Sequence, residues 1–144
     1  MFARHPILTV ASFVYLGLLA WATLTPQSAP ASTNLLWSLA RFFGRFDATQ
    51  WLTFMVLEFL ANIALFVPLG LFFVLLFGRN RWWLAILIGI ALTVLIEYAQ
   101  QFISGRISDP RDLVSNSLGA VIGTILGLLL TAAKARRLKA ARAS

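Results

Sequence analysis

Four long hydrophobic stretches constrain this chain more than any other feature of its sequence. They cover residues 6–24, 51–77, 82–103 and 113–133. The first and last contain no charged residue, and the other two contain only Glu58 and Glu97. About 20 helical residues cross the hydrocarbon core of a bilayer, where a helix satisfies its own backbone hydrogen bonds. The sequence therefore predicts an all-α membrane protein with four transmembrane helices.

The composition supports this prediction and excludes several other classes of protein. The chain is 60% hydrophobic and 12% charged, with a mean hydropathy of +0.84, whereas soluble domains are about 45–50% apolar and about 25% charged. The 144 residues allow one domain, which ends in a basic tail over residues 134–144. Because cysteine is absent and His5 is the single histidine, we expect neither a metal site nor a cofactor.

The basic residues predict the orientation in the membrane. Four spans place both termini on one side, and that side carries most of the basic residues and no acidic one: Arg4, Arg79, Arg81, Lys134, Arg136, Arg137, Lys139 and Arg142. The positive-inside rule therefore places both termini in the cytoplasm. We expect the tail to contact anionic lipid headgroups rather than nucleic acid.

The first stretch also has features of a signal peptide. Arg4 precedes it, and Ala20-Trp21-Ala22 provides small residues for cleavage. Its apolar core is longer than that of a usual signal peptide, which favours a retained helix. Cleavage would leave the orientation of the other three helices unchanged.

The segment between the first two stretches, residues 25–50, contains a further helical pattern. Polar side chains recur on one side and large apolar side chains cover the other: Asn34, Ser38, Arg41 and Arg45 against Leu35, Leu39, Phe42, Phe43 and Phe46. This pattern predicts a short amphipathic helix in the outer interface of the membrane.

Polar side chains within the hydrophobic stretches collect on the side that holds the acidic residues. Glu58 and Asn62 are four residues apart, and Glu97 and Gln100 are three apart, so each pair shares a helix face. An ionisable group inside a bilayer is costly and usually faces the bundle interior or a wet cavity. We therefore expect a site in the outer half of the bundle.

The fourth stretch and the aspartate just before it form a single stripe in which polar residues are followed by glycines: Asp112, Asn116, Gly119, Gly123 and Gly127. Glycine at every fourth residue lets another helix approach closely, which predicts helix packing along this stripe. Asp109 followed by Pro110 is typical of a helix start, with Asp109 as the N-cap. Pro68 and Gly70 predict a kink in the second stretch, because proline removes a helix hydrogen bond.

The order of these residues resembles that of a known family. Asn62-x-x-x-Phe66-x-Pro68-x-Gly70 precedes Glu97-x-x-Gln100, and Arg106-x-x-Asp109-x-x-Asp112-x-x-x-Asn116-x-x-Gly119-x-x-x-Gly123 follows. The pattern is similar to that of the VanZ-like family, although Pro110 lies between the two aspartates and the chain is short. The resemblance implies a bacterial cytoplasmic-membrane protein of the cell envelope. It also implies a link to resistance against teicoplanin, an acylated glycopeptide antibiotic.

The first function that fits these residues is binding of an amphipathic ligand at the outer leaflet. Membrane lipids, a lipid-linked cell-wall precursor or a lipoglycopeptide are candidate ligands. The candidate ligand-binding residues are Glu97, Gln100, Arg106, Asp109, Asp112, Asn116 and Asn62. Among them, Arg106 suits a phosphate or carboxylate because its guanidinium group is a planar fork of donors.

Two further functions and one structural role stay open. An intramembrane enzyme would use Glu97 or Asp112 as a general base and Arg106 to stabilise a developing anion. No activated nucleophile is visible, so the sequence assigns no catalytic residue. A transporter subunit would need a polar path to the inner side, which the sequence does not offer. Glu97 and Arg106 could also form a structural ion pair, and the sequence leaves the oligomeric state undecided.

Overall fold

The computed structural model describes residues 6–25, 31–103 and 109–141, except for the side chains of residues 31–34 and 134–141. These residues form helices and turns, with no strand among them. The helices are α1 (Pro6–Leu24), α2 (Ala31–Phe43), α3 (Phe54–Phe77), the short 3-10 helix η2 (Arg79–Arg81), α4 (Trp82–Gln100) and α5 (Pro110–Ala141).

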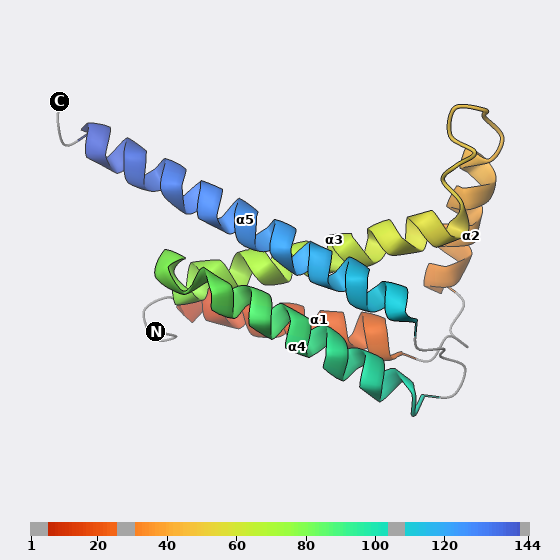
Figure 1. The fold of residues 1–144 in the computed structure, drawn as a ribbon, viewed down its shortest axis with the longest axis horizontal. Coiled ribbons are helices and arrows are strands. Elements are labelled where there is room, and N and C mark those ends of the chain that lie inside the picture. The colour runs from red at the N-terminus through yellow and green to blue at the C-terminus, as the bar shows by residue number, and fades with distance from the viewer. Residues whose placement is uncertain (1–5, 26–30, 104–108, 142–144) are drawn as a thin grey trace.

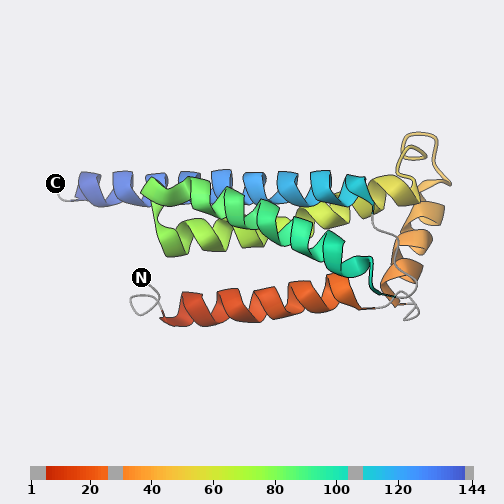
Figure 2. The same ribbon diagram turned by 60° about the horizontal axis from the view of Figure 1, so that its bottom comes forward.

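The four long helices lie side by side, and α2 lies across one end of them (Figures 1 and 2). Helices α3 and α5 run in the same direction, and α4 runs against both of them. We call the end that carries α2 the α2 end, and the end that carries both termini and η2 the terminal end. The four long helices are long and apolar enough to cross a membrane. The predicted fold class, four spans and a shorter helix, is therefore confirmed.

Helices α3 and α5 contact each other backbone to backbone along a line of glycines. A side-chain carbon at Gly123 would overlap the carbonyl oxygen of Val67, and one at Gly119 would overlap that of Ile63. From the other side, a side-chain carbon at Gly70 would overlap the carbonyl oxygen of Ala120. Residues without a side chain therefore let these two helices approach closely, as membrane helices do at small residues.

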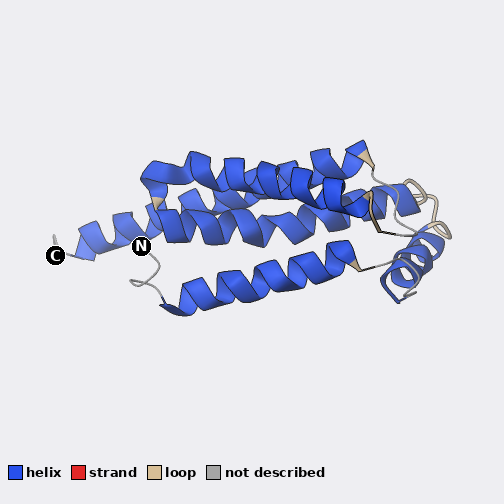
Figure 3. Ribbon diagram, turned by 90° about the horizontal axis from the view of Figure 1, so that it is seen from below, coloured by secondary structure: helices blue, strands red, loops and turns tan. Residues whose placement is uncertain are grey.

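Helix α1 is the least buried of the four long helices and lies along one side of the other three (Figures 2 and 3). Tyr15 connects it to α3, because its hydroxyl donates to the carbonyl oxygen of Leu65 at 2.6 Å. The ring of Tyr15 also packs edge-on against Phe72. Leu65 lies three residues before Pro68, around which α3 continues without a break.

The short helix α2 packs against the start of α3. The rings of Trp37 and Phe54 stack with their centroids 4.4 Å apart. Leu35 and Phe42 on α2 expose more than half of their surface. Exposed apolar side chains on a helix that lies across the bundle fit the predicted amphipathic helix.

Helices α3, α4 and α5 have other bounds than the hydrophobic stretches in the sequence. Helix α3 begins at Phe54, because the Thr53 side chain caps it by accepting from the backbone N–H of Val56. Helix α4 ends at Gln100, and the next residues form a turn. Helix α5 continues through Ala141, so most of the basic tail extends this helix. Alanine, lysine, arginine and leucine, which fill residues 134–141, all favour helix.

Candidate functional site

The register between the antiparallel helices α4 and α5 brings two carboxyl groups toward each other. Gly89 packs against Ala120. One turn closer to the α2 end, the amide Nδ2 of Asn116 donates to Thr93 Oγ1 at 2.9 Å. One further turn in the same direction places Glu97 of α4 opposite Asp112 of α5. Accordingly, the charge of Glu97 acts on the Asp112 carboxylate.

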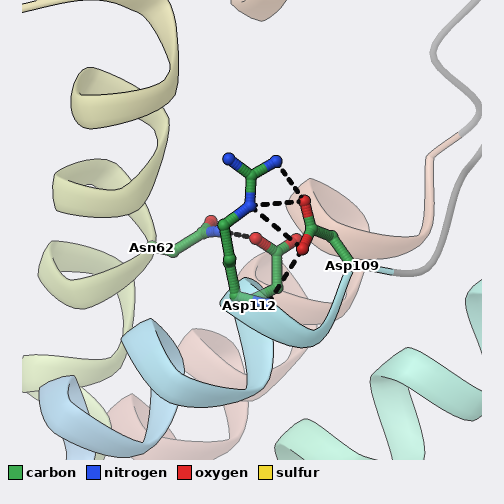
Figure 4. Close-up of polar contacts among 4 residues, drawn as sticks. Asn62, Asp109 and Asp112 are labelled. Carbon is green, nitrogen blue, oxygen red and sulfur yellow. Dashed lines mark hydrogen bonds and ion pairs between the residues drawn. The ribbon is translucent and has the colours of Figure 1, made fainter.

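Helix α3 joins this arrangement through Asn62. Its amide Nδ2 donates to Asp112 Oδ1 at 2.8 Å, across the interface between α3 and α5 (Figure 4). Glu58, one turn closer to the α2 end on α3, also acts on the Asp112 carboxylate through its charge. Helices α3, α4 and α5 thus each contribute one carboxyl group to the same region of the bundle.

We call Asn62, Thr93, Glu97, Asp112 and Asn116 the polar cluster. Its depth increases away from the α2 end: Asp112 and Asn62 are half-buried, whereas Glu97 exposes 8%, Asn116 3% and Thr93 none of its surface. The Oδ1 atom of Asn116 is buried and has no hydrogen-bond partner among the described residues. A buried acceptor without a donor is costly, so this atom is poised to accept a hydrogen bond from another group.

Asp109 lies beside the polar cluster and has a different role. Its Oδ1 accepts from the backbone N–H of Arg111 at 2.9 Å, which makes it the N-cap of α5, followed by Pro110 (Figure 4). Its carboxylate also binds the Arg111 guanidinium, with 2.5 Å between Asp109 Oδ2 and Arg111 Nη2. These hydrogen bonds hold the pKa of the Asp109 carboxyl below its usual range. Asp109 therefore caps α5 and pairs with Arg111 rather than joining the polar cluster.

Gln100 also has a partner, but on α1. Its amide Nε2 donates at 2.9 Å to the carbonyl oxygen of Thr23, in the last turn of α1. The last four carbonyls of a helix have no partner within that helix, so Gln100 satisfies one of them from α4. Gln100 exposes 3% of its surface. The structure thus places Gln100 at the junction of α1 and α4 rather than with Asp112.

Of the seven candidate residues from the sequence, the structure brings Asn62, Glu97, Asp112 and Asn116 together. Arg106 lies outside the described residues. Among the residues that are described, no group of three or more histidine or acidic side chains could hold a metal ion. Sequence reasoning missed Thr93, although this residue lies one turn from Glu97 on the same face of α4. Its position on that face was the signal that could have found it.

Comparison with known proteins adds one match. A family model described as VanZ/LLP1 matches residues 12–131, which include all of the polar cluster. Comparisons with curated proteins and with solved structures give no match.

Proposed function

The chain belongs to the VanZ/LLP1 family, and from this premise we propose that its polar cluster binds the headgroup of an amphipathic ligand. The ligand enters from the leaflet at the α2 end, and its acyl chain lies against the apolar surfaces of the helices. Membrane phospholipids, lipid-linked cell-wall precursors and acylated glycopeptides such as teicoplanin have this chemistry.

One observation carries the proposal: the polar side chains from three apolar helices become more deeply buried away from the α2 end, and the deepest of them include an acceptor atom without a partner among the described residues. Asn116 Oδ1 lies at the deep end of this set and has no partner among the described residues. At its shallow end, Asp112 and Asn62 are half-buried. A headgroup entering at the shallow end supplies the donors that the deep end lacks, which offsets the cost of burying these groups.

The proposed orientation places the α2 end outside the bacterial cytoplasmic membrane and both termini inside. Arg79 and Arg81 in η2 and the basic residues in the last turns of α5 lie toward the terminal end, as the positive-inside rule requires for a cytoplasmic side. The natural chain has no cysteine, so single cysteines report the side directly. In intact cells, Ala48→Cys near the α2 end should react with a membrane-impermeant maleimide, and Asn80→Cys in η2 should react only after lysis. The reverse pattern would place the polar cluster on the cytoplasmic side.

Lipid retention tests ligand binding. The protein is reconstituted in nanodiscs of equal parts phosphatidylethanolamine, phosphatidylglycerol and phosphatidylcholine, and native mass spectrometry measures the lipids that stay bound. Asp112→Asn and Glu97→Gln should each reduce retention about tenfold, since a hydrogen bond to a charged group contributes on the order of 1.5–3 kcal/mol.

The matched control removes a hydroxyl from the same helix far from the cluster. Thr131 donates to the carbonyl oxygen of Gly127 within α5, so Thr131→Val should keep full retention. Equal retention by all four proteins would contradict the proposal and leave the cluster a structural role. A time-dependent change in the mass of a retained lipid would instead favour the intramembrane enzyme.

The link to teicoplanin is tested in a sensitive bacterial host. Expression of the chain should raise the inhibitory concentration of teicoplanin but not that of its deacylated form, because the proposed site takes an amphipathic ligand. Asp112→Asn, inserted in equal amount, should remove this protection. An unchanged inhibitory concentration with the natural chain would exclude an acylated glycopeptide as its ligand.

A further inference from the structure

The polar cluster offers acceptors and uses its own amide donors internally. Asn62 Nδ2 donates to Asp112, and Asn116 Nδ2 donates to Thr93. The remaining groups are carboxylate oxygens and the buried Oδ1 of Asn116. A ligand group that fits these atoms has to bring N–H or O–H donors.

The charges in the same region favour a cationic donor. Glu97 and Asp112 face each other across the interface between α4 and α5, and the charges of Glu97 and Glu58 both act on Asp112. Like charges held close together in a low dielectric repel each other, and a cation between them relieves that repulsion. The guanidinium of Arg111 binds Asp109 and also acts through its charge on Glu58 and Asp112, whereas no such interaction with the more deeply buried Glu97 is found for it.

The geometry distinguishes an ammonium group from a metal ion. The described residues include no set of three acidic or histidine side chains placed to hold a metal ion. An alkylammonium carries three N–H donors, and the cluster presents three acceptor groups: the carboxylates of Asp112 and Glu97, and Asn116 Oδ1 one turn deeper. A quaternary ammonium has no N–H donor and leaves the Asn116 oxygen unsatisfied.

Building on the proposed function, we propose that the polar cluster binds the primary ammonium group of an amphipathic molecule between Glu97 and Asp112, above Asn116. The entrance is the half-buried side at Asp112 and Asn62. The same chemistry is found in a phospholipid with an amine headgroup and in a free long-chain amine. Headgroups without an N–H donor bind more weakly, because they leave the buried oxygen of Asn116 without a hydrogen bond.

The test compares lipids that differ only in the headgroup nitrogen. The protein is placed in nanodiscs of equal phosphatidylethanolamine and phosphatidylcholine with the same acyl chains, and native mass spectrometry counts each retained lipid. We expect retention of phosphatidylethanolamine over phosphatidylcholine by about tenfold, the effect of one charge-assisted hydrogen bond. In separate phosphatidylcholine nanodiscs, dodecylamine should bind and dodecyltrimethylammonium should not. If only phosphatidylethanolamine or only dodecylamine binds, the one that binds identifies whether the ammonium group comes from a phospholipid or from a free amine.

Asp112→Asn keeps the shape of the side chain and removes the charge, so it should abolish the preference for phosphatidylethanolamine. Thr131→Val, which alters a hydrogen bond within α5 far from the cluster, should leave the preference intact. Equal retention of the two lipids by the natural chain, or an unchanged preference in Asp112→Asn, would overturn the ammonium assignment. If Asp112→Asn lowers retention of both lipids equally, headgroup binding stands and the ammonium assignment fails. If it changes neither, both proposals fail.

Discussion

The bundle joins its helices in two different ways. In its middle and toward the terminal end, α3 and α5 meet through glycines, and backbone touches backbone at Gly123 and Val67. Toward the α2 end, the same two helices meet through a hydrogen bond between Asn62 and Asp112, and α4 joins through Thr93 and Asn116. The first contact is steric and leaves no group for a ligand. The second holds carboxylates and a buried acceptor.

The energies of these two kinds of contact indicate that the polar contact toward the α2 end does not serve mainly to stabilise the fold. Hydrogen bonds between membrane helices average only about 0.6 kcal/mol, whereas a charged side chain at the centre of a bilayer costs about 2.5–3.5 kcal/mol. Burying the charge of Glu97, which exposes 8% of its surface, therefore costs more than one such hydrogen bond returns. This deficit supports a role in binding, while the glycine contact supplies the packing.

The largest effect is expected at the glycine contact. Gly123→Ala places a carbon where the carbonyl oxygen of Val67 lies, so α3 and α5 have to separate. We expect a loss of about 3 kcal/mol, the upper range for overpacking, measured as thermal unfolding in detergent. Gly17→Ala is the control, because nothing lies within 4 Å of the added carbon. Equal unfolding temperatures for the two variants would show that the close approach does not stabilise the bundle.

A smaller effect is expected where the end of α4 contacts the last turn of α1. Gln100→Leu removes the donor to the Thr23 carbonyl in the last turn of α1. We expect a loss of about 1 kcal/mol and faster hydrogen exchange in the last turn of α1, with exchange in α3 and α5 unchanged. The exposed neighbour Gln101 provides the control as Gln101→Leu. Faster exchange throughout the bundle would mean that Gln100 stabilises the whole polar end rather than α1.

The smallest effect is expected at the start of α5. Asp109→Ala removes the N-cap, at a cost of about 0.5 kcal/mol, whereas Asp109→Asn keeps a capping side chain. Because the pKa of Asp109 is lowered in the folded protein, its ionised form contributes stability at neutral pH. That contribution is lost as the pH falls through the lowered pKa. Thermal unfolding from neutral to acidic pH should therefore converge for the natural chain and Asp109→Ala. A constant difference would exclude the ion pair with Arg111 as its source.

The sequence by itself determined the helices and the end at which polar groups collect. Hydrophobic length alone identifies the spans, because lipid offers no partner for backbone groups. Asp109 and Pro110 identified the start of α5 because capping depends on neighbouring residues. The spacing of Asp112, Asn116 and the glycines placed them on one face for the same local reason.

Only the tertiary structure decided which side chains meet. Gln100 and Glu97 share a face of α4 in the sequence, yet Gln100 binds α1 and Glu97 faces α5. Thr93 became the partner of Asn116 because the contact between Gly89 and Ala120 sets the register of α4 against α5. Helical periodicity assigns a residue to a face, but the offset between two helices depends on how closely their backbones pack. That distance is a property of both helices together, and no single stretch of sequence contains it.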